Sequence, residues 1–142
     1  MRKTPMRVAS LAAVVATLAA GCGGDDEKTN ADRFEGDEAD VAAIVDDFAE
    51  AGREGDGDRV CGEIFSEELA NFVQRAAKQD CAAEVEENLP EDEYELTVDS
   101  VKVKGTAATV SVTDQDDNRS VLHMQKDGDD WRVIRLTPGV SS

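Results

Sequence analysis

The sequence predicts an α+β domain, with helices in its first part and an antiparallel sheet of about four strands in its second. Apolar residues recur at helical spacing from about residue 38 to residue 89, and from about residue 94 they alternate with a period of two. Because the helices precede the strands instead of alternating with them, the order favours α+β over a parallel α/β fold.

The first helix is predicted to begin near Glu38. Acidic residues cluster at its start, where the positive end of the helix dipole favours them. Its apolar positions recur at i, i+3, i+4 and i+7, which form one face of a helix: Val41, Ile44, Val45 and Phe48. Gly52 is the predicted C-terminal stop of this helix.

Three shorter helices are predicted to follow. Asp56 or Asp58 can cap the first of them, Ser66 the second and Asp80 the third, and Pro90 ends the series. The aromatic side chains on the helical faces are predicted to lie in the core: Phe48, Phe65 and Phe72.

The strands are marked by alternation and by turns. Apolar residues alternate from Tyr94 to Val98 and again from Val101 on the other parity, so a bulge is predicted at Asp99-Ser100. Gly105 predicts a tight turn, and Asp127-Gly128 the centre of a hairpin. The remaining strands are predicted at residues 108–112, 120–126 and 131–136.

The N-terminal residues predict export. A basic start is followed by an apolar run, Val8–Ala20, which is shorter than the roughly 20 residues needed to cross a bilayer. The small residues before Cys22 resemble the lipobox of bacterial lipoproteins, whose cysteine is lipidated and becomes the N-terminus. Residues 1–21 are thus predicted to be a signal peptide, and residues 22–37 a lipid anchor and flexible acidic tether. The alternatives are an ordinary signal peptide with a leftover cysteine and a cytosolic protein.

The charge balance excludes several kinds of partner. The formal net charge is −17, and it becomes more negative once the basic start is removed. Such a chain does not suit nucleic acid, whose binding depends on neutralising phosphates with Lys and Arg. It does not suit a face lying flat on an anionic membrane either.

Cys61 and Cys81 remain as a pair if Cys22 carries lipid. In an oxidising compartment such a pair usually forms a disulfide, which here would join two helices. The alternatives are free thiols, a redox pair or a metal site. The CxxC spacing of redox pairs is absent, and no nearby Cys or His supplies further zinc ligands.

The order of these features resembles that of small exported members of the nuclear transport factor 2-like superfamily. The resemblance covers residues 38–137 and rests on the first amphipathic helix, the segment GDGDRVCGEIFSEEL, the second cysteine and the ending KDGDDWRVIRL. It implies a curved antiparallel sheet wrapped around helices as a cone, often with a cavity, and residues 138–142 would be a tail. Known members include isomerases, polyketide cyclases, dehydratases and non-enzymatic binding modules.

Trp131, His123 and Tyr94 are the candidate residues for a ligand cavity. Trp131 is expected in the core, with ligand stacking as the alternative. His123 is expected to be a half-exposed strand residue, because no spacing assigns it the partner that a general base needs. No catalytic residue and no cofactor are predicted.

A loop that begins at Asp114 partly matches a calcium-binding loop. Asp114, Asp116 and Asn118 occupy the first ligand positions, but Arg119 stands where glycine is required and Gln125 where glutamate is required. The sequence therefore predicts a solvated hairpin loop and no metal site.

These observations predict a lipoprotein anchored to the cell membrane through Cys22, with its domain outside the cytoplasm. Its expected work is non-enzymatic binding of a protein partner in the envelope or of a small apolar ligand. The alternatives are an isomerase- or cyclase-like enzyme that uses a polar group in the cone, and a spacer or assembly protein. The sequence does not predict an oligomeric state.

Overall fold

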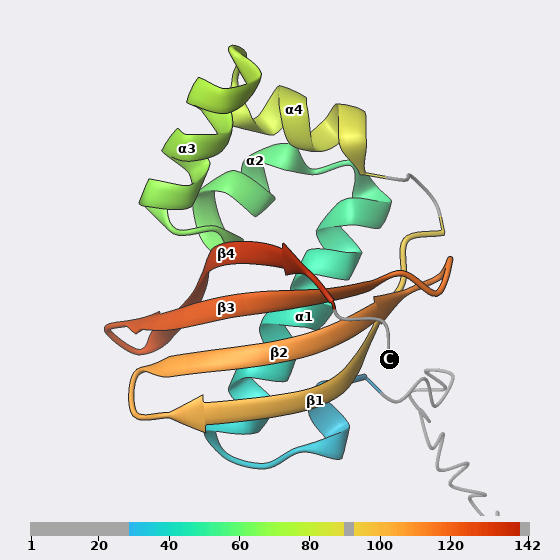
Figure 1. The fold of residues 1–142 in the computed structure, drawn as a ribbon, viewed down its shortest axis with the longest axis vertical. Coiled ribbons are helices and arrows are strands. Elements are labelled where there is room, and N and C mark those ends of the chain that lie inside the picture. Colours follow the sequence, from blue (N-terminus) through green and yellow to red (C-terminus); the bar gives the residue numbers. More distant parts are fainter. Residues whose placement is uncertain (1–28, 90–92, 140–142) are drawn as a thin grey trace, which may run out of the picture.

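A computed structural model of the chain describes residues 29–89 and 93–139 (Figure 1). The predicted signal peptide, the anchor residue Cys22, the helix-ending Pro90 and residues 140–142 lie outside the described residues. No helix in the described part is both long and apolar enough to cross a membrane.

The sheet has four antiparallel strands in the order β1-β2-β3-β4, as the alternation of apolar residues predicted. Their bounds are β1 Leu96–Lys104, β2 Ala107–Asp114, β3 Arg119–Asp127 and β4 Asp130–Pro138. The predicted bulge is confirmed, because the register of β1 shifts between Val98 and Ser100. A second shift lies in β4, where Val133 and Arg135 pair with successive residues of β3 and leave Ile134 as the extra residue.

The helices lie in three places (Figure 1). The long α1 crosses one face of the sheet, the short η1 lies beside β1, and the other helices gather beyond the β4 edge. Their bounds are η1 Ala31–Arg33, α1 Asp37–Glu54, α2 Gly57–Arg59, the π-helical η2 Val60–Ile64, α3 Glu67–Ala77 and α4 Cys81–Asn88. Two predicted caps are confirmed: the Asp56 side chain accepts from the Arg59 amide at 3.0 Å, and Ser66 Oγ accepts from the Leu69 amide at 3.1 Å.

The core forms between α1 and the inner face of the sheet. α1 buries the predicted apolar stripe, including Val41, Val45 and Phe48. The strands contribute their inward residues, which include Val98, Val110, Leu122, Met124 and Trp131. Burial of these apolar side chains supplies the main stabilisation of the fold.

The predicted end of α1 at Gly52 is wrong. The helix continues to Glu54, and Gly55 ends it in the left-handed conformation with φ of 65°. Gly52 has another role: it is buried, and a Cβ at this position would overlap the ring of Tyr94. The glycine therefore permits close packing of Tyr94 on α1.

Residues 29–36 differ from the predicted free tether, because this segment packs on the folded domain. The side chain of Asn30 donates to Asp46 Oδ1 (2.7 Å) and to the Leu96 carbonyl (2.8 Å), and its oxygen accepts from the Val98 amide at 2.9 Å. Arg33 donates to the Val98 carbonyl. The segment thus covers the free edge of β1, and the folded domain begins earlier than residue 38.

Candidate functional site

The space between the sheet and α1 is filled by side chains. Seven inward strand side chains are buried there: Leu96, Val98, Val110, Val112, Leu122, Met124 and Trp131. A hollow of about 50 Å³ remains beside Tyr94 and Phe48, whereas ligand pockets usually enclose about 300–1,000 Å³. The described interior also contains no buried polar or charged residue.

Trp131 lies in the core, only 2% exposed, as its position on the last strand predicted. The ammonium of Lys126 lies 5.7 Å from the centre of its ring, a cation–π contact from the facing strand. Its Nε1 is buried and has no hydrogen-bond partner among the described residues. Trp131 lines neither the small hollow nor the clefts described below.

His123 points to the outer face of the sheet, because its neighbours on β3, Leu122 and Met124, point inward. Its Nε2 lies 3.2 Å from Thr137 Oγ1. Partial burial, aided by the nearby positive charge of Arg135, lowers the pKa of His123.

Tyr94 lies at the rim of the small hollow, with its ring edge-on to that of Phe48 at a centroid distance of 6.0 Å. Burial, together with the negative charge of Asp114, raises the pKa of Tyr94 to about 12. A phenol with this pKa stays protonated at neutral pH. The structure thus places Trp131, His123 and Tyr94 in three different surroundings and does not bring them together.

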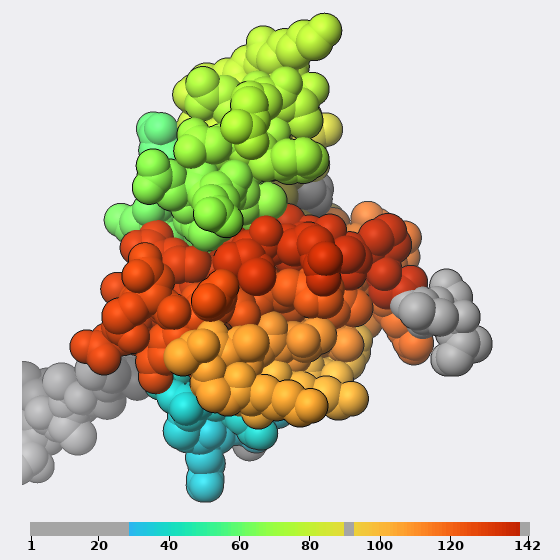
Figure 2. Space-filling view, turned by 60° about the vertical axis from the view of Figure 1, so that its left-hand side comes forward, coloured from blue at the N-terminus to red at the C-terminus, as the bar shows by residue number. Residues whose placement is uncertain are grey.

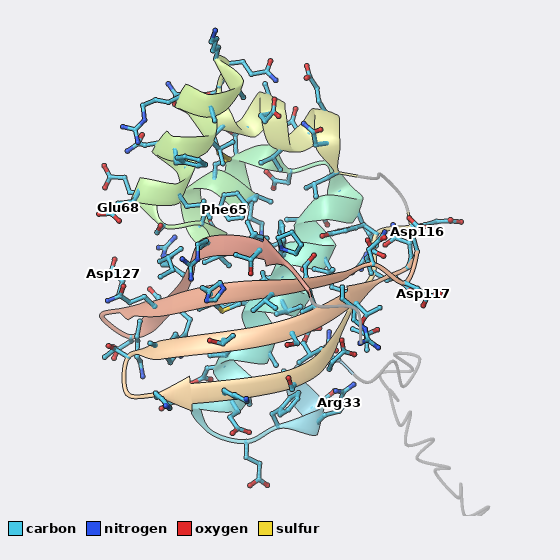
Figure 3. All side chains as sticks on the ribbon, in the orientation of Figure 1. Arg33, Phe65, Glu68, Asp116, Asp117 and Asp127 are labelled. Atoms are coloured by element: carbon cyan, nitrogen blue, oxygen red, sulfur yellow. A yellow bond between two sulfur atoms is a disulfide. The ribbon has the colours of Figure 1, made fainter. Side chains whose placement is uncertain are left out.

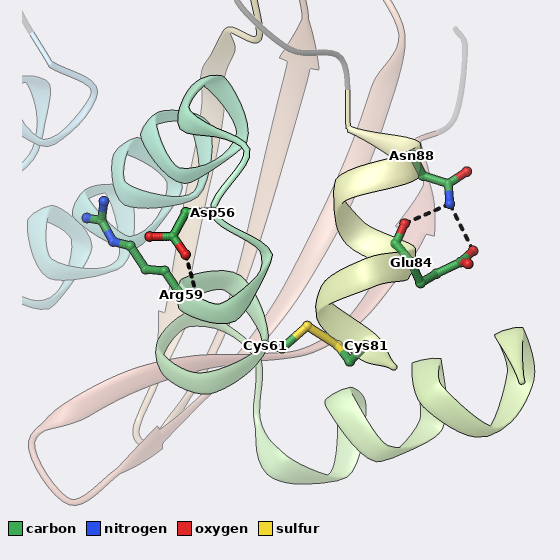
Figure 4. The surroundings of a disulfide bond; sticks show 6 residues. All are labelled: Asp56, Arg59, Cys61, Cys81, Glu84 and Asn88. Carbon is green, nitrogen blue, oxygen red and sulfur yellow. Dashed lines mark hydrogen bonds between the residues drawn. A yellow bond between two sulfur atoms is a disulfide. The ribbon is translucent and has the colours of Figure 1, made fainter. Parts of the chain in front are cut away.

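Cys61 and Cys81 form a disulfide, as their pairing predicted (Figure 4). Cys61 belongs to η2 and Cys81 is the first residue of α4, so the bond joins two helical segments on the β4 side of the molecule. Next to it, Gly57 packs so tightly that a Cβ would overlap the carbonyl of Ala82. The bond fixes α4 on η2, and the close contact fixes it on α2.

In the loop that follows β2, the carboxylate of Asp114 accepts hydrogen bonds from residues of the same loop. Asp114 accepts hydrogen bonds from the amides of Asp116 and Asn118, at 2.8 and 2.9 Å, and from the side chain of Asn118 at 3.1 Å. Burial alone would raise the pKa of Asp114, but these hydrogen bonds outweigh it and lower the pKa. No group of three metal-ligating side chains is found in the part of the chain that the structure describes.

The larger hollows lie outside the cone, between α3 and β4. A cleft of about 630 Å³ lies between the first turns of α3 and the β3–β4 hairpin, and a second of about 400 Å³ continues along α3. The two clefts share Glu68 and Ile134. We call this continuous hollow the α3–β4 groove; Figure 2 shows the face on which the green α3 lies next to the red β4.

The two ends of the α3–β4 groove differ in chemistry. The acidic end carries Glu67 and Glu68 of α3 and, across the cleft, Asp127 of the hairpin. Figure 3 shows Glu68 and Asp127 on the same side of the molecule. The apolar half is lined mainly by hydrophobic side chains: Leu69, Phe72, Val73, Ile134 and Leu136.

The prediction that Phe72 lies in the core is wrong, because its side chain is 60% exposed and lines this groove. The helical spacing correctly placed Phe72 on the apolar side of α3, with Leu69 and Val73. Leu69 is the only residue of α3 that is buried. The sequence signal for this groove was therefore an apolar stripe, and no local pattern indicated that the sheet would leave it uncovered.

The arrangement of a four-stranded, curled antiparallel sheet with four α-helices defines a nuclear transport factor 2-like α+β cone. The chain is similar to a crystallised nuclear transport factor 2-like protein of unknown function from Silicibacter pomeroyi. The identity is 20%, the TM-score is 0.50, and the match covers 70% of this chain and 94% of that one.

A nuclear transport factor 2-like protein of unknown function from Shewanella baltica is also similar, with 16% identity and a TM-score of 0.49 over 70% of this chain and 92% of that one. No family model matches the sequence, and no curated protein matches it. At 20% identity the resemblance to the Silicibacter pomeroyi protein shows the fold alone, and it confirms the fold that the sequence predicted.

Proposed function

We propose that this protein is a lipid-anchored envelope lipoprotein whose domain binds a partner without catalysing a reaction. The observation that carries the binding role is the contrast between a filled interior and an open α3–β4 groove. An enzyme of this fold would need a polar acid/base pair inside an enclosed cavity. The described interior offers a hollow of about 50 Å³, and His123 lies on the outer face of the sheet.

The anchor is supported by the sequence before Cys22 and by the oxidised cysteine pair. A disulfide persists in exported proteins and is rare in a reducing cytosol. Because Asn30 already binds the folded domain, a linker from Cys22 to the domain would be short. Fewer than ten residues would separate the lipid from the β1 edge, and fully extended they would span roughly 25–30 Å.

Mass spectrometry of the protein purified from the membranes of its own cells tests the anchor. We expect a mature chain that begins at Cys22 and carries two or three acyl chains. Cys22→Ser should remove the lipid and move the domain into the soluble fraction. A mature chain that starts at another residue, or an unmodified Cys22, would refute the anchor.

The second candidate, binding of a small apolar ligand, is favoured by the apolar half of the α3–β4 groove. Native mass spectrometry of the purified protein tests this alternative, because a bound small molecule adds its mass to that of the folded chain. A ligand that is retained equally by Phe72→Ser would have to lie elsewhere.

A further inference from the structure

We infer that the α3–β4 groove receives a short segment of another protein, with basic residues at one end and apolar residues along the rest. This inference rests on the binding role proposed above and names the surface and the chemistry of the partner. The argument depends on where the exposed apolar residues lie and on which charges of the groove are already paired.

The large exposed hydrophobic residues of the described chain lie together. Phe72, Ile134 and Leu136 are 60%, 40% and 41% exposed, and all three line the apolar half of the groove. Single exposed apolar residues are normal on a protein surface, but a gathered set is typical of an interaction site. The groove is therefore the part of the described surface that gains most from being covered.

The carboxylates at the acidic end favour binding of a cation. Two basic residues line this cleft, and both are engaged. Lys126 pairs with Asp37 at 3.3 Å, and Arg132 donates to the Gly62 carbonyl at 2.9 Å and to the Glu63 carbonyl. Glu67, Glu68 and Asp127 make no salt bridge with any described residue, so an approaching Lys or Arg side chain would meet carboxylates that are free to pair.

The shape suits a short chain segment. From Ser66 to Val73 α3 rises roughly 10 Å along the groove, which matches three or four residues of extended chain. Arg135, which makes no salt bridge with a described residue, lies in the apolar half of the groove. The basic end of the segment would thus lie over Glu68, and its apolar residues would lie over Phe72 and Leu136.

A second copy of this chain fits the groove poorly. Each copy carries a formal net charge of −17, so the copies repel each other. In a two-fold contact between antiparallel grooves, the carboxylates of one copy would lie against the apolar half of the other. Those carboxylates would lose water without gaining a cation.

Fluorescence anisotropy with synthetic peptides on the full chain tests the inference. The probe is fluorescein-labelled Lys-Lys-Val-Leu-Val-Leu, which has both required features. Glu-Glu-Val-Leu-Val-Leu reverses the charge, and Lys-Lys-Gly-Ser-Gly-Ser removes the apolar residues. We expect the probe to bind about tenfold more tightly than either comparison peptide.

Three double variants locate the site. Phe72→Ser with Leu136→Ser should weaken probe binding about tenfold, because it removes apolar contacts. Glu67→Gln with Glu68→Gln should weaken it about fivefold. The matched control, Glu35→Gln with Glu86→Gln, removes two exposed charges away from the groove and should change the affinity less than twofold. Circular dichroism checks that each variant remains folded.

Several outcomes would overturn the inference. They are failure of the probe to bind, equal binding of Lys-Lys-Gly-Ser-Gly-Ser, and equal weakening by the control variant. A wild-type dimer that Phe72→Ser with Leu136→Ser converts to a monomer, seen by light scattering, would make the groove a self-association surface. None of these results would bear on lipidation of Cys22 or on binding elsewhere, so the proposed function would remain standing.

Discussion

At the β1 edge of the sheet, Asn30 and Arg33 bind the backbone groups of Leu96 and Val98. At the β4 edge, Phe65 makes one parallel bridge with Val133, and the chain then turns away into α3. An uncovered strand edge is a place where another chain can add, and proteins usually protect it. The N-terminal segment closes one edge, whereas the other edge opens onto the α3–β4 groove.

The helices α1 and α3 differ as the two sheet edges do, since one is covered and the other is open. α1 buries seven of its residues, but α3 buries Leu69 alone. Both helices have an apolar stripe, so the stripe itself does not distinguish a structural helix from one that is available to a partner. Because α3 is buried so little, its position depends on local features such as its cap and the nearby disulfide.

The largest expected effect compares two phenylalanines. Phe48→Ala on α1 should lower the free energy of unfolding by about 3–5 kcal/mol, because it removes a buried ring that packs edge-on against Phe65 and Tyr94. Phe72→Ala on α3 should change it by about 0.5 kcal/mol or less. Urea denaturation followed by circular dichroism measures both values, and equal losses would break the comparison.

A smaller effect is expected at the closed edge. Asn30→Ala removes hydrogen bonds to Asp46, Leu96 and Val98, and it should lower the free energy of unfolding by about 2 kcal/mol. The matched change Asn71→Ala, on the exposed side of α3, should cost about 0.5 kcal/mol or less. If Asn30→Ala proved as mild as Asn71→Ala, the N-terminal segment would not be part of the stable fold.

The smallest effect sharpens the difference between the helices. Ser66→Ala removes the side-chain cap of α3 and should lower stability by about 1 kcal/mol. Ser66→Asp keeps an acceptor and should restore most of that loss. Hydrogen exchange should speed up at the Leu69 amide in Ser66→Ala and stay unchanged at amides within α1, whose Gly36 cap has no side chain. Faster exchange throughout both helices would contradict a local role of the cap.

Much of the fold could be predicted because its signals are local. The face of α1, the caps Asp56 and Ser66, the bulge after Val98 and the hairpin at Gly128 each depend on residues that are neighbours in the sequence. The cysteine pair could be predicted from their number and the expected compartment. These features follow from backbone preferences and apolar spacing, which a single sequence contains.

The remaining features depend on contacts between distant segments. Gly52 looked like a helix end, but its role is decided by Tyr94, which approaches from beyond α4. Asn30 is polar and lies in an acidic segment, and only the folded strand β1 provides its partners. The apolar spacing placed Phe72 on a face without showing whether anything covers that face. The groove could not be predicted for the same reason: its two walls meet only after folding.

The bond between Cys61 and Cys81 has a consequence for the integrity of the chain. Together with the intervening backbone it closes a covalent ring, and the whole of α3 lies inside this ring. A protease that cuts α3 once would therefore release no fragment, and the two parts would stay linked until the bond is reduced. The exposed helix α3, which lines the groove, can thus be cut once while both parts remain attached to the protein.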